Sequence, residues 1–149
     1  MIGDELDQER TNMKLKIEPW LTLLGRILLS LIFLLSGFGK FGDWSGTASY
    51  MASKGMVAIP FFLPMAILFE LGGGWSVLLG FKARLGAWAL VFYLIPVSLI
   101  FHNFWAFTGA EHQMQMINFL KNLAIMGGLL LVALRGAGKP GIDGRGKTT

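Results

Sequence analysis

Four apolar stretches separated by short polar segments dominate the pattern of residues along this chain. They cover about residues 19–40, 60–80, 84–107 and 109–134. Each stretch is long enough to cross the ~30 Å hydrocarbon core of a bilayer as a helix that rises ~1.5 Å per residue. Between the first two stretches, Trp44, Ala48 and Met51 recur at roughly helical spacing before Gly55. The pattern predicts an all-α fold, an integral membrane four-helix bundle with a short interfacial helix between spans 1 and 2.

Local signals predict where individual helices begin. Pro19 is suited to the first position of a helix, because the amide hydrogen that proline lacks would have no helical partner there. Thr108, followed by Glu111, fits a capping box, which predicts that the fourth helix starts near Gly109. We expect one polar tail before the membrane domain in the sequence and another after it. The chain then divides into residues 1–18, 19–135 and 136–149.

Composition supports a membrane protein and narrows its chemistry. Of 149 residues, 54% are hydrophobic and only 15% are charged, which is too apolar for a soluble domain of this size. The absence of Cys excludes disulfides, Cys-ligated iron–sulfur clusters and dithiol exchange. The net charge of +4 comes mainly from loops and tails, where membrane topology explains it better than nucleic acid does. We therefore expect no nucleic-acid partner.

The distribution of Lys and Arg predicts the orientation of the chain in the membrane. The two tails and the turn after the second span hold nine of these residues, among them Lys14, Arg145 and Lys147. The other side holds Lys40 and Lys54. By the positive-inside rule both termini are cytoplasmic. We expect a multi-pass protein of the bacterial cytoplasmic (inner) membrane.

One carboxylate, Glu70, lies near the centre of the second span. An ionised Glu at that depth costs on the order of 3 kcal/mol or more unless a partner or water receives it. At ~1.5 Å per residue from the cytoplasmic interface, Arg26 lies near 10 Å, Glu70 near 15 Å and Lys121 near 20 Å. Arg26 can alternatively extend to the near membrane face. We predict a buried cluster in which Glu70 contacts Lys121, Arg26 or both.

Two repeating patterns predict the faces of individual helices. Gly72, Ser76 and Gly80 repeat every four residues in the second span, which predicts a surface where helices approach closely. Polar residues of the fourth span recur on one helical face, and we expect this stripe to turn inward beside the carboxylate of the second span. The stripe consists of Glu111, Gln115, Asn118 and Asn122, with Lys121 beside the last.

Several motifs occur in one order along the chain. They are Gly25-Arg26, Ser36-Gly37-Phe38-Gly39-Lys40, Glu70-Leu71-Gly72-Gly73-Gly74, His102-Asn103-Phe104-Trp105 and Phe119-Leu120-Lys121-Asn122-Leu123-Ala124. With these motifs the chain closely resembles the DoxX family of small bacterial membrane proteins, over roughly residues 21–134. The resemblance implies an inner-membrane four-helix protein in a family named for a subunit of a thiosulfate:quinone oxidoreductase. It also implies a link to quinone, sulfur and oxidative-stress metabolism, while distant eukaryotic relatives act as cargo receptors or chaperones.

The first functional class that fits is a quinone-linked redox protein. Glu70 is the candidate proton-handling residue, since a carboxylate in a low-dielectric interior has a perturbed proton affinity. A possible quinone is the expected ligand, with electrons supplied by a partner. We expect no covalent cofactor and no metal, because the two His residues show no repeated ligand spacing. The candidate ligand-binding residues are Arg26, Lys40, His102, Asn103, Trp105, Asn118, Lys121 and Asn122.

Two other classes remain open. One is a non-catalytic structural subunit that anchors a larger membrane complex, for which glycine-rich faces are suited. The other is a small transporter of anions or solutes, which would need an oligomer. We expect a protein that serves quinone-linked redox or oxidative-stress metabolism as a subunit or accessory of a larger complex. Its expected partners are the lipid bilayer and either other membrane subunits or further copies of the chain.

Overall fold

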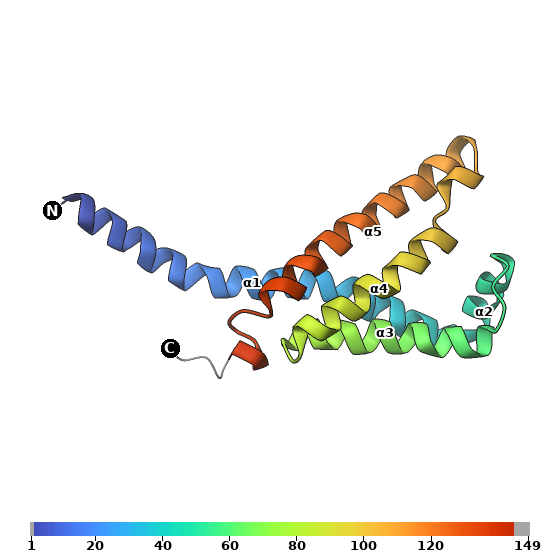
Figure 1. Cartoon of the computed structure of the whole chain (residues 1–149), viewed down its shortest axis with the longest axis horizontal. Helices are drawn as coiled ribbons and strands as arrows, with labels where there is room; N and C mark the ends of the chain where they lie inside the picture. The colour runs from blue at the N-terminus through green and yellow to red at the C-terminus, as the bar shows by residue number, and fades with distance from the viewer. Residues whose placement is uncertain (1, 145–149) are drawn as a thin grey trace.

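The structure is a computed structural model that describes residues 2–144, apart from the side chains of residues 2–5, 14 and 15 (Figure 1). Among the described residues, four helices are long and apolar enough to cross a membrane, and a shorter helix lies between the first two. This confirms the predicted all-α membrane bundle. The elements are α1 (Ile2–Gly42), α2 (Trp44–Ser53), α3 (Ile59–Leu79), α4 (Ala83–Phe101), η1 (Phe104–Ala106), α5 (Gly109–Arg135) and η2 (Ile142–Gly144).

The long helices form two antiparallel pairs, α1 with α3 and α4 with α5. The pairs are joined through extensive contact between α3 and α4, whereas α1 and α5 touch only slightly. Figure 1 shows α4 and α5 diverging from α1 and α3 toward the end that carries α2. We call this end the α2 end. The first and last described residues, Ile2 and Gly144, lie at the opposite end, which we call the tail end.

Glycines set the register between α1 and α3. A Cβ atom on Gly37 would lie 2.7 Å from Leu71 Cδ2, and one on Gly74 would lie 2.9 Å from Leu34 Cδ2. Since the helices are antiparallel, these two contacts place the end of α1 level with the second turn of α3. The first part of α3, residues 59–65, therefore extends beyond α1 by roughly 10 Å at 1.5 Å per residue.

A second set of small residues lets α3 approach α4. A Cβ atom on Gly73 would lie 2.5 Å from Leu90 Cγ, and one on Gly86 would lie 2.3 Å from Ser76 Oγ. By contrast, a Cβ atom on Gly72 would meet no described atom within 4 Å. The prediction that Gly72 belongs to the close-packing face is therefore wrong. The face turns about a hundred degrees per residue, so the adjacent glycine takes that role.

Two helix starts test the local signals. Helix α5 begins at Gly109, which confirms the predicted start, but within the described chain the Thr108 side chain makes no capping hydrogen bond. Helix α1 continues through Pro19 back to Ile2, so the prediction that Pro19 opens the helix is wrong. A proline inside a helix removes one backbone hydrogen bond, and here that loss does not end the helix.

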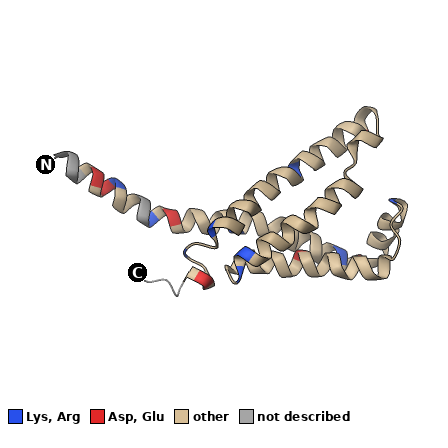
Figure 2. Ribbon diagram, in the orientation of Figure 1, with Lys and Arg blue, Asp and Glu red and all other residues tan. Residues whose placement is uncertain are grey.

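Apolar side chains both fill the bundle and cover its outside. The main core comes from all four long helices and includes Phe33, Val77, Leu90 and Leu129. Many large apolar side chains instead point outward; Leu35 and Phe92, for example, are more than half exposed. Figure 2 shows few charged residues along the bundle and most of them on the N-terminal part of α1 and at the tail end. The exposed apolar surface is the part that contacts the lipid bilayer.

Candidate functional site

A cavity of about 930 Å³ lies between the two helix pairs at the α2 end. Its volume falls within the range of small-molecule sites, about 300–1,000 Å³. Every helix from α1 to α5 contributes to the wall, together with the turn after α2. The polar and charged lining residues are Ser36, Lys40, Thr47, Tyr50, Lys54, Glu70, Tyr93, His102, Lys121 and Asn122.

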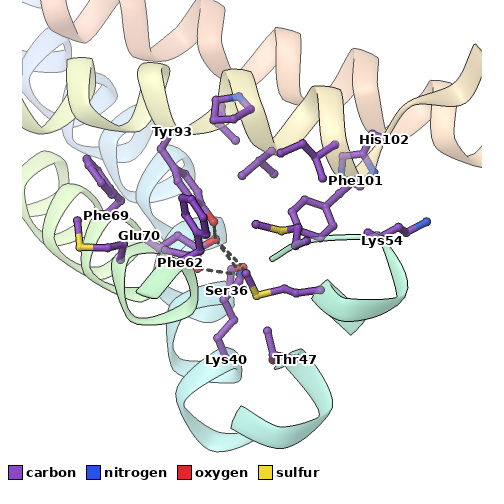
Figure 3. A pocket seen from close by; sticks show the side chains of 18 of the residues that line it. Ser36, Lys40, Thr47, Lys54, Phe62, Phe69, Glu70, Tyr93, Phe101 and His102 are labelled. Carbon is purple, nitrogen blue, oxygen red and sulfur yellow. Dashed lines mark hydrogen bonds and ion pairs between the residues drawn. The ribbon is translucent and has the colours of Figure 1, made fainter. Parts of the chain in front are cut away.

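Glu70 is the centre of a polar cluster in the wall of this cavity (Figure 3). Its Oε1 accepts hydrogen bonds from Ser36 Oγ at 3.0 Å, Lys40 Nζ at 2.9 Å and Tyr93 OH at 2.8 Å. Lys40 Nζ also donates to Oε2 at 2.9 Å and to Ser36 Oγ at 2.6 Å. The side chain of Glu70 is 5% exposed and that of Lys40 is 23% exposed. The carboxylate is thus buried and paired, while the ammonium reaches the edge of the cavity.

The helix registers explain why these four residues meet. Ser36 and Lys40 are four residues apart and share one face of α1. Gly37, between them, lets the α1 backbone approach Glu70, whose Cβ would lie 3.3 Å from a Cβ at that glycine. The contact between Gly73 and Leu90 sets α3 against α4 so that Tyr93, one turn further along α4, faces Glu70. The cluster is therefore a product of close helix packing.

Aromatic side chains make up much of the remaining wall. Phe69 stacks on Tyr93 with ring centroids 6.1 Å apart. Phe62, two helical turns before Phe69 on α3, also lines the cavity. Tyr50 of α2 stacks on Phe101 of α4 with centroids 5.6 Å apart. This second stack bridges α2 and the α4–α5 pair, so it closes one side of the cavity. A flat apolar ring fits such walls, because aromatic rings attract one another in offset and edge-on arrangements.

Polar groups of α4 and α5 form the opposite wall. His102 Nδ1 lies 3.0 Å from Gln115 Oε1. Because an amide oxygen only accepts, Nδ1 donates this hydrogen bond, and in a neutral ring Nε2 is then an acceptor. The buried amide of Asn122 donates to Ser98 Oγ at 3.1 Å. Residues of the predicted polar stripe differ in burial. Gln115 and Asn122 are buried inside the bundle, whereas Glu111 is exposed, so only part of the stripe turns inward.

The prediction that Glu70 contacts Lys121 or Arg26 is wrong. Glu70 pairs with Lys40, and neither Arg26 nor Lys121 forms an ion pair with it in the described chain. The prediction measured depth along each helix from its own end, as though all helices ended at one level. Gly37 of α1 lies level with Glu70 of α3, and Lys40 follows Gly37 by less than one helical turn. Because α3 extends beyond α1, Lys40 is close enough to pair with Glu70.

Arg26 lies at the tail end, far from the cavity. Its guanidinium is buried beside Gly80, about 15 Å along α3 from Glu70 at 1.5 Å per residue. Nη2 donates to the backbone oxygen of Pro140 in the segment that follows α5. The Asp143 carboxylate of that segment accepts from the backbone amides at the start of α4, at 3.0 and 3.1 Å. Arg26 and Asp143 thus fasten the C-terminal segment to the bundle.

The structure brings together five of the nine candidate residues. Asn103 and Trp105 do not line the cavity; Trp105 packs edge-on against Phe104 and Phe119 on the side of η1. Asn118 contacts the cavity only through its hydrogen bond to Lys121. Of the candidates, those that line the cavity are Lys40, Glu70, His102, Lys121 and Asn122.

Sequence reasoning missed Ser36 and Tyr93. Ser36 stood within a recognised motif, and Tyr93 is one of only two Tyr residues, placed at the middle of an apolar span. A phenol at that depth needs a hydrogen-bond partner, which was the available signal. In the described chain, no group of three or more His, Cys, Asp or Glu side chains gathers as metal ligands. The site therefore offers hydrogen bonds, charge and apolar surface.

Four membrane-crossing helices around an internal cavity with a buried ion pair define a multi-pass membrane protein with a small-molecule-sized site. Residues 21–103 match the DoxX family, and the chain belongs to it. It is 37% identical to inner membrane protein YphA of Escherichia coli over 85% of this chain and 91% of that protein. It is 36% identical to inner membrane protein YqjF of Escherichia coli, over 86% and 93%.

A more distant relative is the ER-derived vesicles protein ERV29 of Saccharomyces cerevisiae. The two are 25% identical over 89% of this chain, which spans 36% of that protein. No solved structure matches the chain significantly. The matched range includes Ser36, Lys40, Glu70 and Tyr93, so it covers the polar cluster and most of the cavity wall.

Proposed function

We propose that this protein binds a quinone-type ligand in the cavity at the α2 end. It would serve quinone-linked redox or oxidative-stress metabolism of a bacterial inner membrane, as a subunit or accessory of a larger complex. The observation that carries the proposal is the buried cluster of Glu70, Lys40 and Tyr93 in the wall of a cavity lined mainly by aromatic and aliphatic side chains. A cavity with a few convergent polar groups is typical of binding sites for apolar molecules that carry oxygen atoms.

The cluster suits the chemistry of a quinone oxygen. The ammonium of Lys40 already donates to Glu70 and Ser36, but it is partly exposed, so a ligand carbonyl can take the place of one of these acceptors. Tyr93 and Glu70 already share a hydrogen bond of 2.8 Å, so a proton can pass between them. Reduction of a quinone to the quinol needs electrons as well as protons. The electrons would come from a partner oxidoreductase, and the cluster would supply or receive the protons.

Binding of a short-chain ubiquinone tests the proposal. The purified protein in lipid nanodiscs should bind it saturably, and Lys40→Met should weaken binding at least about tenfold, the loss of one charge-assisted hydrogen bond. Tyr93→Phe, which keeps the ion pair and therefore the fold, should weaken it several-fold. Lys82→Met at the tail end is the matched control and should bind like the unchanged protein. Equal affinity in all four proteins, or no saturable binding, would overturn the proposal.

A non-catalytic anchoring role is the second candidate, favoured by a separate observation. Gly25, Gly39, Gly72 and Gly127 lie on outward surfaces where an added Cβ would meet no described atom within 4 Å. Small outward residues allow another membrane helix to approach closely. A chain that only anchors a partner would still co-purify with it after Tyr93→Phe. It would bind no quinone before or after the change.

A transporter is less well supported by the packing. The cavity lies at the α2 end, and a path to the tail end would cross Val77, Leu90 and Leu129, none of which is exposed at all. All three side chains belong to the main hydrophobic core. A solute that enters the cavity therefore meets a closed core within this one chain.

A further inference from the structure

The charges that line the cavity do not balance. Three lysines, Lys40, Lys54 and Lys121, face a single carboxylate, that of Glu70. The remaining ionisable lining groups are a histidine and two tyrosines, which add no negative charge at neutral pH. The wall therefore carries an excess of positive charge among side chains that are mainly apolar.

Two of the three ammonium groups already have favourable neighbours. Lys40 is paired with Glu70. Lys54 lies over two aromatic rings, 5.6 Å from the centroid of Tyr50 and 5.2 Å from that of Phe107. Such contacts partly offset the loss of water around an ammonium group. Lys121 is thus the lining lysine for which the described chain shows neither an ion pair nor an aromatic ring beneath the ammonium.

A ligand in the cavity can reach Lys121, whose side chain lines the cavity and is exposed. Its Nζ donates to Asn118 Oδ1 at 3.0 Å, and no Asp or Glu oxygen of the described chain lies within 4.0 Å of it. An ammonium carries three hydrogens, so two remain for another acceptor. Lys121 lies about 18 Å from the start of α5 at 1.5 Å per residue, near the middle of the helix. A lysine at that depth calls for an anion or for water.

We infer that the ligand of this cavity is an organic anion: a ring compound whose ionised hydroxyl or carboxylate group pairs with Lys121. The ring lies among the aromatic side chains, and its carbonyl oxygen reaches Lys40. The inference rests on the proposed function, since it names the class of quinone-type ligand that the same site takes. Asn122 and His102, on the same wall, offer further hydrogen bonds to the anionic end of the ring.

A matched pair of naphthoquinones separates charge from shape. At pH 7.5, 2-hydroxy-1,4-naphthoquinone is an anion, whereas 2-methyl-1,4-naphthoquinone has nearly the same size and is neutral. Because the chain contains no Cys, the methyl compound meets no thiol with which to react. In nanodiscs of zwitterionic lipid, the anion should bind at least about tenfold more tightly.

Variants at one position assign the preference. Lys121→Met keeps the length and apolar stem of the side chain and should abolish the preference, so that the two compounds bind with similar affinity. Lys121→Arg should retain it, and Lys82→Met, at the tail end, should behave as the unchanged protein. Equal affinity for the two compounds in the unchanged protein would overturn the inference and leave the proposed function standing. Binding of neither compound would instead contradict the proposed function.

An anionic lipid headgroup is the competing source of negative charge. Adding phosphatidylglycerol to the nanodiscs should change the affinity of the anionic naphthoquinone by no more than about twofold. General repulsion from the charged surface acts equally on the Lys121→Met protein, so any loss of affinity in that variant measures the repulsion and is subtracted. A loss of anion binding that occurs only when Lys121 is present would show that the headgroup occupies the site. That result would overturn the inference.

Discussion

Glu70 accepts hydrogen bonds from residues of α1 and α4 while it belongs to α3. The carboxylate therefore holds three helices at one level of the bundle. Four donated bonds satisfy its two oxygens, and the ammonium of Lys40 compensates its charge. A buried pair of this kind tolerates loss of both charges better than loss of one, because a single change leaves the other charge unpaired.

A double-mutant cycle on this pair tests that view. Lys40→Met alone should cost about 3 kcal/mol, the lower end for a buried pair because Lys40 is partly exposed. The apparent unfolding temperature in detergent should then fall by roughly 10 °C. Lys40→Met together with Glu70→Gln should recover most of that loss, since the amide still accepts from Tyr93 and Ser36. If the double variant is less stable than either single variant, the two residues do not act as a pair.

At this scale the sequence predicted the ionisable centre better than its partner. A carboxylate in the middle of an apolar span is improbable without a role, and that singled out Glu70. Four of the predicted ligand-binding residues, Lys40, His102, Lys121 and Asn122, line the cavity. The pairing with Lys40 depends on how far α3 extends beyond α1. That offset comes from glycine contacts between helices, which spacing along one helix does not encode.

The elements owe their close packing to particular glycines of α3. Gly73 lies on the face of α3 that packs against α4, and Gly74 lies on the face that packs against α1. Both neighbouring helices therefore approach α3 closely. The sequence indicated that glycines in this span serve packing. It selected Gly72, whereas Gly73 and Gly74 make the close contacts, because a shift of one residue rotates the face by about 100°.

Adjacent glycines provide a matched test. Gly73→Ala should destabilise the protein by about 1–3 kcal/mol, because the new Cβ would lie 2.5 Å from Cγ of the fully buried Leu90. Gly72→Ala adds the same methyl group where it meets no described atom, and should leave stability unchanged or raise it by up to about 1 kcal/mol. Thermal unfolding of the two variants side by side measures the difference. Equal effects would contradict the assigned helix faces.

The whole molecule is a bundle whose architecture was largely readable from the sequence. Span number, the helix between spans 1 and 2 and the start of α5 follow from hydropathy and turn residues. The long N-terminal extension of α1 did not, because Pro19 and the charged residues before it are typical of a helix boundary. The structure places both termini at one end of the bundle, as an even number of spans requires.

The charge distribution predicts which side of the membrane that end faces. Of the cations counted for this side, Arg145, Lys147 and the side chain of Lys14 lie outside the described residues. Lys82, Arg84, Arg135 and Lys139 lie at the tail end of the described chain. A green fluorescent protein fused after residue 149 should fluoresce, and alkaline phosphatase fused there should be inactive, because the positive end stays cytoplasmic. Active phosphatase would reverse the orientation and put the cavity on the cytoplasmic side.

The divergence of α4 and α5 from α1 and α3 makes the bundle broader at the α2 end (Figure 1). Since α1 and α5 scarcely touch, the two pairs are joined mainly through the contact between α3 and α4. We therefore expect lateral pressure of lipid on the outer flanks to act on the spacing of the two pairs, and with it on the room in the cavity between them.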